Sequence, residues 1–269
     1  MLRQAKDLKG YKLSSRDGEI GKVNEFYFDD QNWAVRYLIA DTGGWLTGRQ
    51  VLISPYALDR ARTDDKVIPV DLTRKQIEDS PSLAADKPVS RQYEMLYYPY
   101  YGYPGYWGGG YMWGSAGYPI RGQAGWSQYT SHDSHDENDD PHLRSTRDVT
   151  GRTIQAQDGA IGDVEDFVID DETWAIRYLI IDTGNWWPGK KVLISTQWIE
   201  KISWEESKVF INLTRETIKQ GPEYTKAALI TRDYETNLYR HFDREGYWEN
   251  QLPIESAQVE RQRSHYSAG

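Results

Sequence analysis

Apolar and polar residues alternate in several short runs, each bounded by turn-forming residues. In residues 33–40 every second position is apolar, and Leu38 and Ala40 make the opposite face apolar as well. A strand with one apolar face covers a core, whereas a strand with two apolar faces lies in the middle of a sheet. We therefore predict a central strand over residues 33–40.

Shorter runs surround this strand. Residues 51–53 are all apolar and predict a short buried strand, and alternation at Ile68, Val70 and Leu72 predicts another. Between residues 20 and 28 the alternation breaks next to Gly21, which predicts a β-bulge or a sharp twist. Because closure hides strand edges, five or six such strands are expected to form a small barrel.

Turn and capping residues separate the predicted strands. Asp17-Gly18 is a dipeptide that accepts the positive φ of a tight hairpin turn. Thr73 and Gln76 have the spacing of a capping box and predict the start of a short helix.

The whole pattern occurs twice, at a constant offset of 141 residues. Of the 45 positions from Gly10 to Ser54, 24 are identical to the residue 141 positions later. The match covers residues 8–107 and 149–248, and includes a helix start at Ser90 and Thr231 that predicts an arm packed on one of the barrels. Two copies are too few for a solenoid. We predict an intramolecular pseudo-dimer of the two repeats about an approximate two-fold axis.

The predicted fold class is mainly β, with two small β-barrels, short helical arms and a flexible linker. The aromatic, glycine-rich run after residue 97 has too little aliphatic content for a core of its own, and residues 128–142 are acidic and expected to be disordered. The predicted boundaries are repeat 1 over 1–81, a helical and aromatic arm over 82–107, a low-complexity linker over 108–144, repeat 2 over 145–222, a second arm over 223–248 and a disordered tail over 249–269.

Composition narrows the choice of environment and partner. The chain has 269 residues, no cysteine and a net charge of −9. The lack of cysteine excludes disulfides and thiolate metal sites and favours a cytoplasmic location. An acidic chain is not expected to bind nucleic acid, because Lys and Arg supply most of that affinity. No apolar run is long enough for a transmembrane segment, and none follows the basic N-terminus as in a secretory signal.

Two groups of residues are candidates for binding. Trp45, Trp186 and Trp187 lie in glycine-containing loops that could contact a partner, although the same loops are explained by turns capped by aspartate. Three histidines among aspartates form a weak candidate for a zinc or nickel site, and they are His132, His135 and His142. The alternative is a solvated linker, because ordering such a segment costs conformational entropy.

Charged residues in and beside the strands are further candidates for chemistry. The pairs Asp29-Asp30 and Asp170-Asp171 could serve acid–base or calcium chemistry, but adjacent strand residues point to opposite faces, so we predict turns. Arg36 and Arg177 interrupt apolar strands, and we predict a structural role for both.

Each of these arginines needs an acidic partner if it is buried. The candidates in the preceding strand are Glu25 for Arg36 and Asp166 for Arg177. No nucleophile elbow, catalytic triad or phosphate-binding glycine loop is present. The prediction is therefore no catalytic residue, no cofactor and no enzymatic activity.

The ordered pattern resembles the PRC-barrel domain. It runs Asp-Gly, Ile-Gly-x-Val-x-(Asp/Glu)-Phe, Asp-Asp, Trp-Ala-(Val/Ile)-Arg-Tyr-Leu-Ile and Val-Leu-Ile-Ser in both copies. That domain occurs in the cytoplasmic part of the photosynthetic reaction centre H subunit and at the C-terminus of the ribosome-maturation factor RimM. The resemblance implies a bacterial tandem protein whose small barrels serve binding or assembly.

The functional prediction is a binding or scaffold protein that mediates assembly with an unidentified protein partner. One alternative is a membrane-associated accessory protein related to H-subunit electron transport in the light reaction, located at the periphery of the inner membrane. The chain lacks the membrane-spanning helix of that subunit. A second alternative is a RimM-like factor associated with RNA or the ribosome, although this chain lacks the barrel that precedes the module there.

Overall fold

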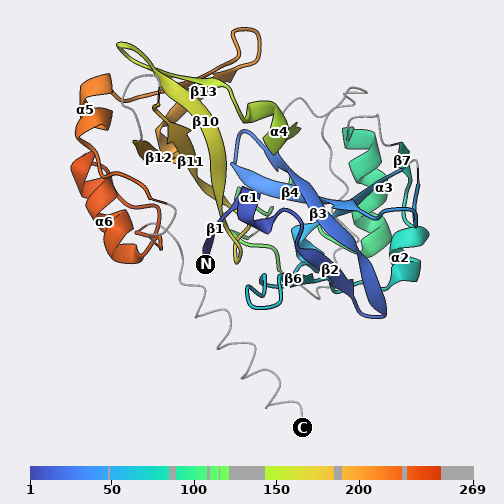
Figure 1. Cartoon of the computed structure of the whole chain (residues 1–269). Helices are drawn as coiled ribbons and strands as arrows, with labels where there is room; N and C mark the ends of the chain where they lie inside the picture. Colours follow the sequence, from blue (N-terminus) through green and yellow to red (C-terminus); the bar gives the residue numbers. More distant parts are fainter. Residues whose placement is uncertain are drawn as a thin grey trace. The chain divides into compact units, whose positions relative to one another are not determined.

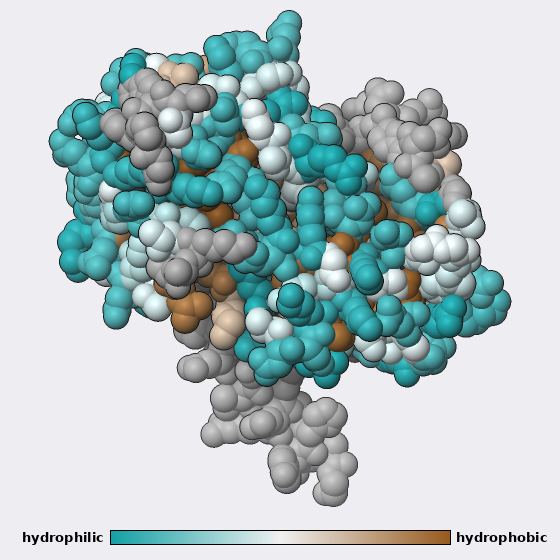
Figure 2. All heavy atoms as spheres, viewed as in Figure 1, coloured by the Kyte–Doolittle hydropathy of each residue, from teal (hydrophilic) through white to brown (hydrophobic). Residues whose placement is uncertain are grey.

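The structure is a computed structural model that describes residues 1–47, 49–84, 89–107, 110–114, 116–120, 143–184, 190–225 and 229–249. The chain forms two compact units, Met1–Thr225 and Lys226–Gly269. Both β-sheets belong to the first unit, and helix α6 belongs to the second (Figure 1). Hydrophilic residues cover most of the face seen in Figure 2.

The order of elements is nearly the same in both repeats, and among the described residues it differs in that the first repeat has strand β7 and the second has strand β13. The first repeat contains β1 (Leu2–Gln4), α1 (Ala5–Leu8), β2 (Lys12–Ser15), β3 (Gly18–Asp29), β4 (Ala34–Asp41), β5 (Arg49–Ile53), η1 (Pro55–Ala57), β6 (Val67–Pro69), α2 (Arg74–Glu78), β7 (Leu83–Ala84) and α3 (Arg91–Tyr101). The second contains β8 (Leu143–Ser145), α4 (Thr146–Val149), β9 (Thr153–Ala156), β10 (Gly159–Asp170), β11 (Ile176–Asp182), β12 (Lys191–Ser195), η2 (Thr196–Trp198), β13 (Ile199–Ser203), β14 (Lys208–Ile211), α5 (Arg215–Gln220) and α6 (Arg232–His241).

Each repeat builds a strongly bent sheet around its own core. The strand orders are β6-β2-β3-β4-β5-β7 and β12-β11-β10-β9-β14-β13, and no ladder joins the end strands within the described residues. Strand β4 lies between β3 and β5, and every side chain from Ala34 to Ala40 is buried. The predicted central strand is thereby confirmed.

Gly21 permits a close approach of the β3 backbone to the end of β4. Pairing between β2 and β3 shifts register beside it, as expected for a bulge. A Cβ atom on Gly21 would lie 2.1 Å from the carbonyl oxygen of Asp41. A Cβ atom on Gly162 would lie at the same distance from the carbonyl oxygen of Asp182. Only glycine fits such an approach, so the predicted bulge is confirmed in both copies.

The predicted helix starts are also confirmed. The Thr73 hydroxyl accepts a hydrogen bond from the Gln76 amide (3.2 Å), while the Gln76 side chain accepts one from the Thr73 amide (2.8 Å). Ser90 caps α3 and Thr231 caps α6 in the same way. These caps satisfy amide groups that have no partner within the helix.

The two repeats exchange their first strands. Strand β1 of the first repeat pairs antiparallel with β10 of the second, and β8 of the second pairs antiparallel with β3 of the first (Figure 1). β1 and β8 are equivalent under the 141-residue offset. Each repeat therefore completes the sheet of the other, and these strands were not predicted from the sequence. β8 begins at Leu143, inside the segment expected to be linker.

Two backbone hydrogen bonds join the repeats where β4 and β11 begin. The Val35 amide donates to the Trp174 carbonyl (2.8 Å), and the Ile176 amide donates to the Trp33 carbonyl (2.7 Å). Both tryptophans have a positive φ, 52° for Trp33 and 58° for Trp174. This conformation costs about 1–2 kcal/mol for a residue with a side chain, and it aims each carbonyl at the other repeat.

In each repeated Asp-Asp pair, one aspartate binds an arginine of its own repeat and the other binds an arginine of the other repeat. Asp30 accepts from Arg144 of the second repeat at 3.1 Å, and Asp171 is paired with Arg3 of the first. These two ion pairs are equivalent under the offset. The predicted turn location is correct, and the second aspartate of each pair additionally binds the other repeat.

The first aspartate of each pair binds the strand arginine, which corrects the predicted partners. Arg36 is fully buried and bonds Asp29 at 2.9 Å, not Glu25. Arg177 lies 3.6 Å from Asp170, and Asp166 is not its partner. The register between adjacent strands explains why the observed partners differ from the predicted ones. Glu25 lies opposite Ile39 and Asp166 opposite Ile180, each three residues further along the strand than the arginine.

The arm helix α3 packs on its own barrel through a buried glutamate. Glu94 accepts hydrogen bonds from the hydroxyls of Tyr37 (2.7 Å) and Tyr106 (3.0 Å) and pairs with Arg91 (2.7 Å). The Arg91 guanidinium also lies 4.4 Å from the Trp107 ring centre. In the second unit the same motif recurs, since Glu235 accepts from Tyr247, pairs with Arg232, and Arg232 lies over Trp248. The repetition of the Tyr-Glu and Tyr-Trp segments thus has a structural cause.

Part of the aromatic run is buried between the repeats. The Trp113 ring is almost fully buried, and its indole nitrogen donates to the Thr173 carbonyl of the second repeat (3.0 Å). Arg36 lies 3.8 Å from the Tyr106 ring centre and donates to the Met112 carbonyl (2.7 Å). Residues 121–142, which hold most of the predicted linker, lie outside the described residues.

Removing a buried inter-repeat carboxylate should cost far more stability than breaking a surface pair. Asp171→Asn leaves both Arg3 and the Met1 amino group without their buried partner, and we expect the free energy of unfolding to fall by about 3 kcal/mol. Asp71→Asn, which removes the exposed pair with Arg16, should cost less than about 1 kcal/mol. Urea denaturation of both variants measures the difference, and equal losses would show that the exchanged strands do not depend on this contact.

Candidate functional site

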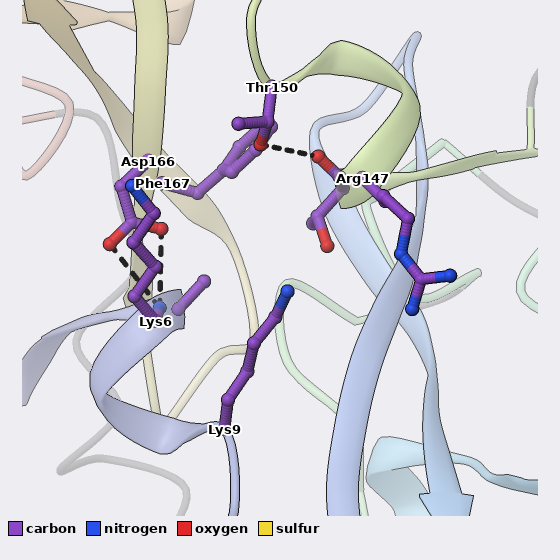
Figure 3. Close-up of a pocket in the computed structure, with 8 residues that line it drawn as sticks. Lys6, Lys9, Arg147, Thr150, Asp166 and Phe167 are labelled. Carbon is purple, nitrogen blue, oxygen red and sulfur yellow. Dashed lines mark hydrogen bonds between the residues drawn. The ribbon is translucent and has the colours of Figure 1, made fainter.

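A pocket of about 140 Å³ lies where the two repeats meet (Figure 3). Its walls come from α1 and α4, the residues just after them, and β10. The lining residues are Ala5, Lys6, Lys9, Thr146, Arg147, Thr150, Asp166 and Phe167. Under the 141-residue offset Lys6 corresponds to Arg147 and Lys9 to Thr150. The pocket therefore lies near the approximate two-fold axis.

The exchanged strands position both short helices of the pocket. In α4 the Ser145 hydroxyl caps the helix by accepting from the Arg147 amide (3.0 Å). Gln4 precedes α1 and offers no side-chain cap. Instead the Lys6 amide donates to both carboxylate oxygens of Asp166, at 3.2 and 3.3 Å, across the repeat boundary.

Asp166 and its equivalent Glu25 differ in their surroundings. The Ser145 hydroxyl donates to Glu25 at 2.6 Å, and Arg147 lies 3.6 Å from the same carboxylate. Asp166 is 3% exposed, and burial raises its pKa to about 6, against the lowering effect of the Phe167 and Lys6 amides. A buried carboxyl with a raised pKa beside a pocket is a common property of functional sites.

Three cationic side chains border the pocket, and Figure 3 shows them on both of its sides. Lys9 extends upward between the two walls, with Lys6 and Asp166 on one side and Arg147 on the other. The Lys6 ammonium lies 3.9 Å from Glu165, a loose contact. Cationic groups around a small polar pocket can hold an anionic group.

The residues predicted as sites from the sequence do not line this pocket, apart from Asp166. Trp45 is half-buried, and the Arg74 guanidinium lies 4.5 Å from its ring centre. Its loop is a turn in which Asp41 accepts from the Gly43 amide (3.0 Å). A partner contact at Trp45 stays a prediction. Trp186, Trp187, His132, His135 and His142 lie outside the described residues.

Sequence reasoning did not bring Lys6, Lys9, Arg147 and Asp166 together. One signal was available, because Leu2-Arg3 recurs as Leu143-Arg144 and Asp7 as Asp148, so the repeat begins before Gly10. Within the described ranges no group of three or more His, Cys, Asp or Glu side chains is placed to hold a metal. Nor does a helix among those residues have the length and apolarity to cross a bilayer.

Comparison with known families agrees with this architecture. A family model for the PRC-barrel domain matches residues 2–77 and 142–218, which together make up more than half of the chain. The chain belongs to the PRC-barrel family. Both matched segments of this PRC-barrel protein begin at the exchanged strands β1 and β8. The curated proteins include no match to the chain.

The raised pKa of Asp166 predicts a pH-dependent cost in stability. The carboxyl is easier to protonate in the folded chain, so the native state loses stability as pH rises from its ordinary pKa of 3.8 through about 6. We expect Asp166→Asn to be more stable than the wild type by about 3 kcal/mol at neutral pH.

Near pH 4 the two proteins should unfold at similar urea concentrations, since the wild-type carboxyl is then largely neutral like the amide. Urea unfolding at several pH values measures the difference. A gap between the two proteins that does not change with pH would contradict the expected origin.

Proposed function

We propose that this PRC-barrel protein is a non-enzymatic scaffold that binds a partner protein through the outward face of helix α3. Met95 is 56% exposed, Leu96 is 63% exposed and Tyr100 is 40% exposed. Leu96 and Tyr100 are four residues apart and are neighbours on the helix surface, while Met95 lies about 100° around the helix axis from Leu96. Contiguous exposed apolar side chains of this size are typical of protein-binding surfaces.

The second repeat supplies an internal comparison for this face. Inward residues keep their chemistry, since Glu94 and Tyr98 of α3 correspond to Glu235 and Tyr239 of α6. The outward residues change from apolar to polar, and the three equivalents of the apolar residues are Thr236, Asn237 and His241. The helix and its buried contacts form with either kind of outer surface. The apolar surface of α3 is therefore not required by the fold, which supports a role in binding.

Charge around this face favours one kind of partner. The Tyr100 hydroxyl donates to the Gln76 carbonyl of α2 (2.8 Å), so the apolar face continues to that helix. Glu78 of α2 and the C-cap residue Asp79 are exposed there, and Lys75 pairs with both, at 3.9 and 2.8 Å. The chain as a whole carries a net charge of −9. A partner that presents an apolar helix face flanked by Lys and Arg is complementary, whereas a second copy of this chain would add like charge.

Site-directed photocrosslinking in the source cells tests the proposal. A photoreactive residue at position 96 of α3 should give one discrete adduct with another protein, while the same residue at position 237 of α6 should not. Mass spectrometry identifies the adduct, and the partner is then purified.

Binding of that partner to the full chain is measured by calorimetry. The variant Met95→Thr with Leu96→Asn carries the residues of the second repeat and should weaken binding roughly 30-fold, because two anchoring apolar side chains are lost. Its stability should not fall, since both side chains are already exposed. Asn237→Ala is the matched control and should bind like the wild type.

Other occupants would overturn the proposal. An adduct of the chain with itself would indicate self-association, and an adduct with RNA or a lipid would assign a different class of ligand. Equal adducts at positions 96 and 237, or unchanged affinity in the double variant, would also contradict a role for this face.

A further inference from the structure

The pocket between α1 and α4 carries more positive than negative side chains on its walls. Lys6, Lys9 and Arg147 line it, against the single carboxyl of Asp166. Lys9 makes no ion pair with a carboxylate in the part of the chain that the structure describes. An approximate two-fold axis brings equivalent residues face to face, so it places Lys6 and Arg147 on opposite walls. Lys6 lies 3.9 Å from Glu165 and Arg147 lies 3.6 Å from Glu25, so two of these cations are neutralised only through long contacts. The remaining repulsion among the three would fall if an anion lay between them.

We propose that this pocket binds a single small oxyanion group of the phosphate or sulfate type, held by Lys9 and Arg147. The volume of about 140 Å³ accommodates one such group and not a nucleotide. The ligands come from both exchanged segments, so the bound anion links the two repeats. This site is separate from the α3 face and does not depend on the proposed partner.

Asp166 makes the binding dependent on pH. Its negative charge opposes an anion in the pocket, and its pKa of about 6 means that the charge disappears on mild acidification. The other charged groups around the pocket are Lys6 and Asp7 of α1, Lys9, Arg147 of α4, Glu25 of β3, which lies 3.6 Å from Arg147, and Glu165 of β10, which is held by Lys191 at 2.6 Å. Asp166 is the group in the pocket wall whose raised pKa lies in the tested range, so affinity should rise from pH 7.5 to pH 5.5.

Calorimetric titration of the full chain with sulfate tests the site. Sulfate remains a dianion over this pH range, and chloride holds the ionic strength constant so that general screening does not change. We expect saturable binding in the millimolar range that is roughly tenfold weaker in Lys9→Gln, because one charge-assisted hydrogen bond is lost. Lys22→Gln removes the same charge from an exposed position outside the pocket and should leave affinity unchanged.

The pH arm uses Asp166→Asn. This variant should bind sulfate at pH 7.5 as tightly as the wild type does at pH 5.5, and its affinity should change little with pH. A second arm separates two sources of the same chemistry, by sedimentation with phosphatidylcholine vesicles that contain phosphatidic acid. Sedimentation that requires Lys9 would assign a lipid headgroup, and sulfate binding without sedimentation would assign a free oxyanion.

Three results would overturn the site. They are no saturable sulfate binding, equal affinity in Lys9→Gln and wild type, and loss of affinity in Lys22→Gln as large as in Lys9→Gln. Thermal unfolding of each variant without sulfate confirms that a loss of binding is not a loss of folding. Added sulfate should raise the unfolding temperature of the wild type and not that of Lys9→Gln, because a ligand stabilises the state that binds it.

Discussion

Strands β1 and β8 each complete a sheet that belongs to the other repeat, and the remaining inter-repeat contacts follow from this exchange. A strand at an open edge leaves its amide and carbonyl groups unpaired, so the reciprocal pairing satisfies two edges at once. The exchange also delivers Arg3 to Asp171 and Arg144 to Asp30. It places α1 beside α4, and so creates the walls of the pocket. Loss of either strand would affect the edge, the ion pair and the pocket together.

The strand exchange explains why several residues are the same in both repeats. The Trp-Ala step places a strained tryptophan where its carbonyl meets the other repeat, and the strain is tolerated because both copies make the same bond. In each Asp-Asp pair one carboxylate holds the strand arginine and the next holds an arginine from the other repeat. Adjacent residues reach in different directions, which is the property that made a shared catalytic role unattractive from the sequence. Repetition at these positions reflects the needs of assembly between the two halves.

Features with a short-range cause could be predicted from the sequence. The central strand follows from its two apolar faces, the bulge from Gly21, and the helix starts from Thr73 and Ser90. β1 and β8 could not be predicted in this way, because three half-buried residues show no alternation and their partners are far away in the chain.

The candidate site depends on the same distant pairing. Asp166 acquires its raised pKa only when the other repeat buries it, and Lys9 reaches the pocket only because α1 crosses to that repeat. The partners of Arg36 and Arg177 were mispredicted for a related reason, since the register of neighbouring strands decides which acid is close.

Covalent fusion of the two repeats has a consequence for stoichiometry. In an assembly of two identical chains every surface occurs twice, so an advantageous change on one helix is forced on its twin. A duplicated chain keeps the two-fold contacts between its repeats, while the surface residues of one repeat can differ from those of the other. Here one arm helix is apolar outside while its counterpart is polar. A partner that docks on α3, as proposed above, therefore meets one such position per chain, which gives the molecule a direction that a symmetric dimer cannot have.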